Sequence, residues 1–313
     1  MLLQDALDLS YQWPSLTPGL LCGFDKLDLY LGGLQRAQLH MLYGPEGIGA
    51  SSLMMNMVLQ VARHAGVLYF TSDDQQLISS QMLCAYGSFA RDRLDRGLIT
   101  RKELNATRET MGRWLRYPVS IENFGELSPE HILESIPFRL NDTRLMGGNV
   151  GLVVLDIGNQ AAQWSNECFA RLRQMAEELA VAVLVHVSLP VSALPAEVID
   201  DGMNAMPGVM WLLPHLTTIE GEMSELPNSA QADVVMLMHW SLDPKTGAAY
   251  PERRIMQVVR RSDRFHMGIS LWHDPASGAF EEDEVGLCWG SFPRSCDACD
   301  WINGNEDSDF EFN

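Results

Sequence analysis

Short apolar runs alternate with stretches of helical periodicity along most of this chain. The runs that predict strands are 39–43, 67–72, 151–156, 182–188, 233–240, 254–260 and 268–274. Strands that alternate with helices are typical of an α/β fold, in which helices cover both faces of a parallel sheet. The last two runs lie close together in the sequence, so we predict that they form an antiparallel edge.

Two of the connecting segments have clear helical periodicity. In the first, 51–66, one stripe consists of Leu53, Met57, Val61 and Ala62. In the second, 167–180, the stripe consists of Phe169, Leu172, Met175, Ala176 and Leu179. Apolar residues at this spacing indicate helices that pack one face on a core. We predict that the first helix ends at Gly66, because glycine is common just past a helix C-terminus.

Proline and charge divide the chain into segments. We interpret 1–18 as a short linker-like segment, 19–282 as one α/β domain and 283–313 as an acidic tail. Within the domain, 190–230 is interrupted by prolines but is too apolar for a free linker. We therefore expect an insertion that packs on the domain or on a partner.

Composition narrows the class of protein. The 313 residues, 46% of them hydrophobic, are enough to bury a full core. The apolar runs are far shorter than the ~20 residues of a membrane span, and the first residues lack the pattern of an export signal, so we expect a cytoplasmic protein without a membrane partner. The six cysteines are mostly scattered, and Cys296 and Cys299 find no complete ligand set with Cys288 or His273. We therefore expect no zinc.

The charge is strongly negative and unevenly distributed. The net charge is −19, and the segment from Glu281 onward holds ten acidic residues against one basic residue, Arg294. Because nucleic-acid affinity comes largely from Lys and Arg that neutralise phosphates, this balance argues against extensive contact with DNA or RNA. A local groove lined by arginines stays open, since net charge does not report distribution.

The stretch GPEGIGASS, residues 44–52, has the spacing of a phosphate-binding loop, G-x-x-x-x-G-K-[ST], between a strand and a helix. In such a loop backbone N–H groups surround phosphate oxygens, the lysine reaches the outer phosphates and the hydroxyl binds Mg²⁺. The candidate nucleotide-binding residues are Gly44, Gly47, Gly49, Ala50, Ser51 and Ser52. Ala50 stands where the motif has its lysine. A glycine-rich turn without a ligand is the alternative.

Carboxylates follow two of the predicted strands. Asp156 ends the run at 151–156 and is, with Ser51, the candidate Mg²⁺ ligand, because a carboxylate at the carboxyl edge of a sheet faces the phosphates. A helix cap is the alternative for Asp156. Asp73 and Asp74 follow the run at 67–72, where a carboxylate serves either as a general base on water or as the cap of the next helix.

Two further groups of residues are candidates for contact with other chains. Arg261 and Arg264 follow the strand at 254–260, where an arginine presented to a neighbouring subunit's nucleotide would stabilise charge; a solvated strand end is the alternative. The tail ends DSDFEFN, whose Asp309, Phe310 and Phe312 are similar to the acidic tips by which bacterial single-strand-binding proteins dock onto basic pockets. A merely solubilising tail is the alternative there.

In this order the motifs resemble those of the C-terminal, RecA-fold motor domain of DnaB-type replicative DNA helicases, over about 19–282. GFDKLDLYLGGLQ is similar to that family's G-F-x-x-L-D-x-x-x-G-G-L-Q, and NSAQADVV is similar to its S-x-x-I-E-Q-D-A-D-V-V. VLYFTSDD, GLVVLDIGNQ and ELAVAVLVHVSL lie between them in the family's order. The resemblance implies a RecA-like P-loop NTPase fold, ATP or ADP with Mg²⁺ as cofactor, a hexamer, and protein partners in replication or repair.

The chain departs from that family at the residues of its chemistry. Ala50 replaces the loop lysine, and Asp73 is one methylene shorter than the catalytic glutamate. In the family's S-Q-L-N-R, Ser188 replaces Gln and Val191 replaces Arg. The family's K-Q-R, which includes the arginine finger, falls on 261–263, or makes Arg264 the finger after a shift of one residue.

The lost lysine decides between the functional hypotheses. An opposite-charge pair at about 4 Å is worth ~4 kcal/mol at an effective dielectric near 20, or about a thousandfold in binding. We therefore expect weak binding of ATP or ADP at most, and no efficient turnover.

Our first hypothesis is a degenerate helicase-like protein that binds or assembles with partners in DNA replication, recombination or mobile-element maintenance. The alternative is an ATP-dependent, ring-shaped helicase acting on single-stranded DNA, with a cation supplied by Arg260, Arg261 or Arg264 of a neighbour. A RecA-like recombination or clock-type ATPase ranks third.

Overall fold

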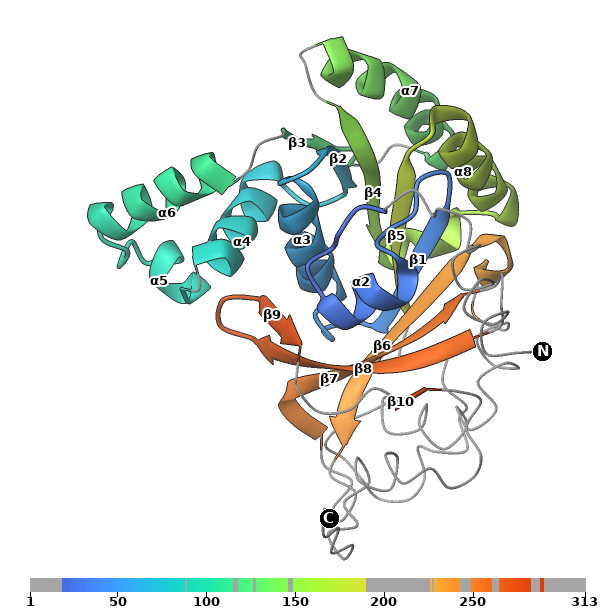
Figure 1. The fold of residues 1–313 in the computed structure, drawn as a ribbon. Coiled ribbons are helices and arrows are strands. Elements are labelled where there is room, and N and C mark those ends of the chain that lie inside the picture. The colour runs from blue at the N-terminus through green and yellow to red at the C-terminus, as the bar shows by residue number, and fades with distance from the viewer. Residues whose placement is uncertain are drawn as a thin grey trace, which may run out of the picture.

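The computed structural model describes residues 19–87, 89–114, 118–125, 128–145, 149–189, 226, 228–242, 249–260, 265–282 and 288–289. One sheet of ten strands runs through this part of the chain (Figure 1). Its strands are β1 (Leu39–Pro45), β2 (Gly66–Thr71), β3 (Val119–Asn123), β4 (Val150–Gly158), β5 (Ala182–Leu189), β6 (Val234–Leu242), β7 (Ala249–Arg260), β8 (Phe265–Asp274), β9 (Ala279–Glu282) and β10 (Cys288–Trp289).

The strand order is β10-β8-β7-β6-β1-β5-β4-β2-β3, with β9 paired to β8. The strands from β6 to β3 in this order are parallel to one another. β7 and β8 are antiparallel, as we predicted from the two last apolar runs, and β7 is also antiparallel to β6. The carboxyl ends of the parallel strands therefore meet at one edge of the sheet.

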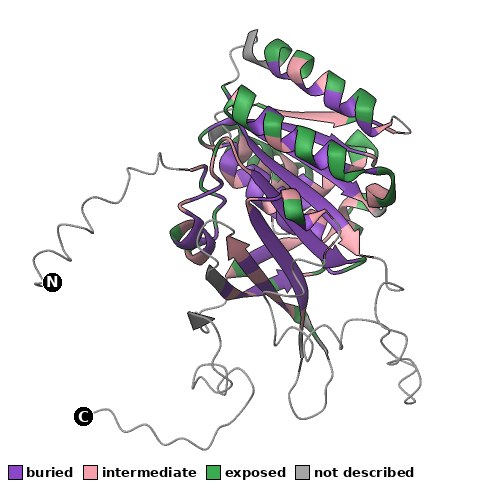
Figure 2. Ribbon diagram, turned by 90° about the vertical axis from the view of Figure 1, so that its right-hand side faces the viewer, coloured by how far each residue is buried: buried purple, intermediate pink, exposed green. Residues whose placement is uncertain are grey.

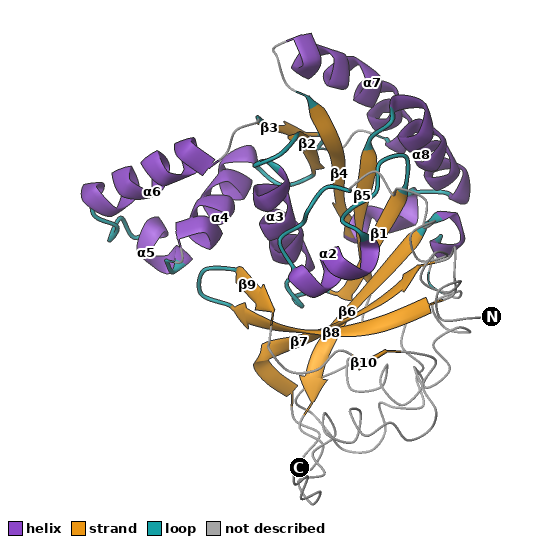
Figure 3. Ribbon diagram, in the orientation of Figure 1, coloured by secondary structure: helices purple, strands orange, loops and turns teal. Residues whose placement is uncertain are grey.

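Helices cover both faces of the sheet (Figure 3). They are α2 (Asp25–Leu31), α3 (Ala50–Val61), α4 (Gln75–Gly87), α5 (Arg91–Asp95), α6 (Arg101–Trp114), α7 (Pro129–Leu145) and α8 (Asn166–Leu179), with short 3-10 helices η1 (Asn159–Gln163) and η5 (Ser229–Gln231). One buried cluster joins α2, α3 and α4 to the sheet, and a second joins α7 and α8 to its other face. Figure 2 shows the central strands buried and the outer helix faces exposed. This is the α/β fold that the alternation of elements predicted, and its RecA-like form is what the resemblance to the helicase family implied.

The prediction that Gly66 caps the helix after the glycine loop is wrong. Helix α3 ends at Val61, and its C-cap is Ala62 in ordinary right-handed conformation. Gly66 is the first residue of β2, where its N–H donates to the carbonyl of Asn149 at 2.8 Å. A Cβ built on Gly66 would lie 3.3 Å from the backbone of Val150, so the glycine allows close approach of two strands.

The other predicted helix, 167–180, is α8, and the apolar positions of its stripe from Phe169 to Ala176 are buried. No helix in the described part of the chain is both long and apolar enough to cross a bilayer. Residues 1–18, nearly all of 190–230 and most of the tail lie outside the described residues.

Candidate phosphate-binding site

The glycine-rich loop connects β1 to α3, as the motif requires. Gly47 and Gly49 have φ of +80° and +97°, a conformation that glycine adopts without strain. A Cβ built on Gly44 would lie 2.7 Å from the side chain of Ile48, so the first glycine is needed for the loop to close. Nothing lies within 4 Å of a Cβ built on Gly47, so the loop is open at its middle.

Ala50 is the first residue of α3 and is only 3% exposed. Its methyl group belongs to the buried cluster under the sheet. The N-terminus of α3 still offers unpaired N–H groups and a partial positive charge to an anion. The loop therefore keeps its backbone contribution and lacks its principal cation.

An open cleft of about 500 Å³ lies against this loop. It is lined by the loop, by the ends of β2, β4 and β5, and by the β8–β9 turn; among the lining residues are Gly47, Gly49, Ala50, Ser51, Ser52, Asp73, Asp156, Ser188 and His273. Among the described residues that line the cleft, none is Lys or Arg. The predicted nucleotide-binding and metal residues, apart from Gly44, thus line one cleft together with Asp73.

Asp156 is buried at the end of β4 and is held from two sides. Its Oδ1 lies 2.7 Å from Nδ1 of His186, which is its partner in register on β5. The hydroxyl of Tyr69 on β2 donates to its Oδ2 at 3.0 Å. Burial, followed by the charge of Asp156, raises the pKa of Tyr69 well above its usual value, so the phenol remains a donor.

The imidazole of His186 also contacts the loop. Its Nδ1 lies 3.3 Å from Oγ of Ser51, the hydroxyl that the motif assigns to Mg²⁺. His186 is 4% exposed and lines the cleft. A ring nitrogen therefore lies between the two predicted metal ligands, Ser51 and Asp156.

Asp73 and Asp74 take different places: one caps the next helix and the other lines the cleft. Asp74 caps α4, because its Oδ1 accepts from the N–H groups of Gln76 and Leu77 at 2.7 and 3.2 Å. Asp73 instead lines the cleft. Desolvation, and then the charge of Asp156, raises the pKa of the Asp73 carboxyl above its usual value.

Arg254 and His273 reach the loop from the antiparallel strands β7 and β8. Nε of Arg254 on β7 donates to the carbonyl of Ile48 at 2.8 Å, and its Nη2 lies 3.3 Å from Nδ1 of His273 on β8. The ring of His273 stacks on Phe280 with centroids 4.3 Å apart. Burial, then the charge of Arg254, lowers the pKa of His273 to about 4, so this imidazole is neutral at neutral pH.

With the fold and the cleft in view, comparison with known proteins decides the family. The family model described as DnaB-like helicase C terminal domain matches residues 19–191, more than half of the 313 residues. The chain belongs to this DnaB-like helicase family. None of the curated proteins compared matches it.

Two solved structures share the fold. A DnaB-like replicative helicase, described with its interactions with primase, is 14% identical, with a TM-score of 0.63 over 89% of this chain and 66% of that one. A separately solved ATPase domain is 15% identical, with a TM-score of 0.64 over 90% of this chain and 97% of that one. This chain thus spans just under two thirds of the helicase chain and nearly all of the ATPase domain.

The groups that the DnaB-like family implies fit this site unequally. A phosphate group fits, because the loop backbone is open and the helix N-terminus faces the cleft. A magnesium ion held by Ser51 and Asp156 does not fit this arrangement, because both carboxylate oxygens are hydrogen-bonded and the imidazole of His186 lies between the ligands.

Other predicted residues lie elsewhere. Arg260, at the end of β7, donates to the carbonyl of Tyr30 at 3.2 Å and stacks over its ring. The remaining candidates are outside the described residues; they are Val191, Arg261, Arg264, Cys296, Cys299, Asp309, Phe310 and Phe312.

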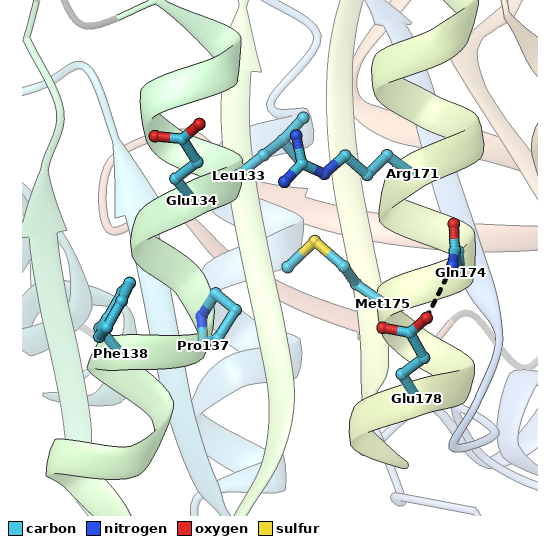
Figure 4. Close-up of a pocket in the computed structure, with 8 residues that line it drawn as sticks. All are labelled: Leu133, Glu134, Pro137, Phe138, Arg171, Gln174, Met175 and Glu178. Atoms are coloured by element: carbon cyan, nitrogen blue, oxygen red, sulfur yellow. Dashed lines mark hydrogen bonds between the residues drawn. The ribbon is translucent and has the colours of Figure 1, made fainter.

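A second cavity, of about 510 Å³, lies between α7 and α8, on the face of the sheet opposite α3. Figure 4 shows Leu133, Pro137 and Phe138 on one helix and Arg171 and Met175 on the other. Gln174 donates to Glu178 at 2.7 Å along one wall. Phe138 is 73% exposed, and the titratable side chains that line this cavity are Glu134, Arg171 and Glu178.

Sequence reasoning did not single out His186 or Arg254, and it considered His273 only as a zinc ligand. His186 lies in an apolar strand, where a polar residue reads as an isolated exception, and Arg254 lies in a strand that also carries Glu252 and Arg253. One signal was available: His186 lies near the carboxyl end of its run, at the level where Asp156 ends its own, and the ends of parallel strands meet at one edge. No comparable signal places β7 and β8 behind the loop.

Proposed function

We propose that this chain is a DnaB-like helicase domain that has lost efficient nucleotide turnover and serves as a binding or assembly protein. The observation that carries the proposal is Ala50, whose buried methyl group takes the place of the lysine in a loop that is otherwise intact. An uncompensated phosphate there loses about a thousandfold in stabilisation by the Coulomb estimate. Asp73, shorter than the family's glutamate, weakens a second catalytic position.

The proposed setting is DNA replication, recombination or mobile-element maintenance. The likeness to a replicative helicase described with primase supports partners from the replication machinery, and the family's assembly supports an oligomer. A cytoplasmic location accords with this setting. Contact through Asp309, Phe310 and Phe312 stays a prediction, as does the finger role of Arg261 or Arg264.

The alternative is an ATP-dependent ring helicase that borrows a cation from a neighbouring subunit. The arginines at the end of β7 are the candidate donors for such a ring. Arg260 is the one among them in the described part of the chain, and its guanidinium already contacts Tyr30 of the same chain. That contact argues against Arg260 as the donor and ranks the alternative second.

ATP hydrolysis by the purified chain, with and without single-stranded DNA, separates the two proposals. We expect no turnover above background in either condition. We also expect that Ala50→Lys fails to restore turnover, because Asp73 and His186 still differ from what the chemistry needs. Ala170→Lys, on the exposed face of α8, controls for an added lysine away from the cleft. Robust hydrolysis by the unmutated chain would reverse the ranking.

A further inference from the structure

His186 occupies a position that neither the loop motif nor the family explains. Its Nδ1 lies 2.7 Å from Asp156 and 3.3 Å from the hydroxyl of Ser51. In a phosphate loop these two residues are the ones expected to hold a divalent cation. The side chains of His186 and Asp156 are both only 6% exposed, so the contact lies inside the protein wall rather than at a mobile surface.

The hydrogen-bonding capacity of these groups fixes the direction of each contact. A carboxylate only accepts, so the hydrogen on Nδ1 of His186 points at Asp156. The second carboxylate oxygen accepts from Tyr69 at 3.0 Å. Because Nδ1 carries its only hydrogen toward Asp156, it cannot also accept from Ser51. The hydroxyl hydrogen of Ser51 is therefore available to a ligand in the cleft.

A magnesium ion needs oxygen ligands at about 2.0–2.1 Å in near-octahedral geometry and gives up its waters reluctantly. Between Ser51 and Asp156 it would meet the imidazole ring and a carboxylate whose oxygens are already engaged. Binding it there would require moving a buried side chain and breaking a short hydrogen bond. We propose that the loop of this chain binds a phosphate group without a divalent cation, with His186 filling the cation's position.

The donors for such a phosphate are present without a metal. The first turn of α3 offers backbone N–H groups, and Ser51 offers its hydroxyl. Arg254 can only donate, so Nδ1 of His273 accepts from it and neutral His273 keeps its hydrogen on Nε2. That Nε2 lies 3.4 Å from a Cβ built on Gly49, against the loop. His273 lines the same cleft as the loop, so this N–H is a candidate donor to a phosphate held there.

The charges along the cleft favour a ligand with few phosphates. Glu46, Asp73 and Asp156 line it, and no lysine or arginine does so among the described residues. Without a cation, each added phosphate increases the repulsion from these carboxylates. The ligand class is therefore a mono- or diphosphate rather than a triphosphate, either free or at the end of a nucleoside. This inference rests on the proposed retention of the loop as a binding site.

Calorimetric titration of the full chain with ADP and with pyrophosphate, each in excess Mg²⁺ and in EDTA, tests the proposal. We expect dissociation constants in the two buffers to agree within about twofold. Binding of ADP alone assigns the site to nucleosides, and equal binding of both assigns it to the diphosphate. A loss of about tenfold or more in EDTA overturns the proposal. No binding of either probe also overturns it, and leaves the assembly role standing.

Variants locate the effect at His186. His186→Ala opens the cation's position, so its affinity in Mg²⁺ should exceed its affinity in EDTA by about tenfold. His186→Asn keeps an N–H toward Asp156 and should remain indifferent to Mg²⁺, which also covers the case in which the alanine variant fails to fold. His40→Ala is the matched control, because His40 is also a buried strand histidine and does not line the cleft. If His186→Ala binds equally well in Mg²⁺ and in EDTA, His186 does not fill the cation's position.

Discussion

Asp73 and Asp74 are neighbours in the sequence, yet their carboxylates have different surroundings. Asp74 accepts from two N–H groups at the start of α4, and Asp73 faces the cleft near the charge of Asp156. The sequence could not show which aspartate caps the helix and which faces the cleft, because an aspartate side chain suits both roles. The division depends on where the chain turns after β2.

Replacing these two aspartates should affect stability differently. Asp74→Ala removes an N-cap and should lower the free energy of unfolding by about 1 kcal/mol. Asp73→Asn should leave stability at neutral pH unchanged or raise it, because the raised pKa means that folding penalises the ionised form. Urea denaturation at several pH values measures both.

The pH dependence provides the internal check for Asp73. A raised pKa in the folded state adds stability as pH falls through that pKa, because the native carboxyl then takes up its proton. The advantage of Asp73→Asn should therefore shrink as the pH is lowered. A destabilised Asp73→Asn variant at neutral pH would mean that this carboxylate has a stabilising partner.

At the scale of elements, hydrophobic periodicity predicted most strands and two of the helices. It did not predict the elements that are polar or only half-buried. Seven strands, the helix after the loop and α8 follow from apolar spacing alone. β3 escaped because its residues are half-buried and half polar, and α6 because it is polar along most of its length and lies outermost beside α5 (Figure 1). The glycine loop, Asp73, Asp156 and Ser188 could be predicted to converge, because the carboxyl ends of parallel strands share an edge.

The residues that give the site its character required tertiary information. His186 contacts Asp156 because β5 lies beside β4, and Arg254 reaches the loop because β7 folds back across the sheet. Hydrophobic periodicity does not show which strands are neighbours in the sheet. The sequence therefore predicted a loop lacking a cation, and the fold adds that an imidazole contacts both predicted metal ligands.

The end of α8 offers a test of helix termination. Ala180 is its C-cap at φ 53°, and the N–H of Val181 bonds to the carbonyl of Ala176, the pattern usually closed by glycine. Ala180→Gly should raise the free energy of unfolding by about 1 kcal/mol, because alanine is strained in this conformation. The same change at exposed Ala170, inside the helix, should lower it by about 1 kcal/mol. Two shifts of the same sign in thermal or urea unfolding would contradict this cap.

At the scale of the whole molecule, the distribution of charge distinguishes a DNA-binding helicase from a protein that binds other proteins. The net charge is −19. On the outlying α5 and its connection to α6, three arginines are each paired with a carboxylate at 2.7–3.5 Å; they are Arg91 with Asp95, Arg93 with Glu103 and Arg96 with Asp92. Exposed pairs of this kind add little stability, but each places a negative charge beside a cation that phosphates would otherwise use.

Single-stranded DNA should therefore bind this chain weakly. Non-specific binding by basic proteins has dissociation constants of about 10⁻⁴–10⁻⁶ M at physiological salt, and each phosphate contact contributes through counterion release. We expect fluorescence anisotropy with labelled single-stranded DNA to show no saturation below about 10⁻⁴ M at this salt, with or without ADP. Replacing Asp92, Asp95 and Glu103 by the matching amides frees the three arginines and should strengthen binding at low salt. Micromolar, steeply salt-dependent binding by the unmutated chain would instead reveal a basic path that net charge conceals, and would favour the ring helicase.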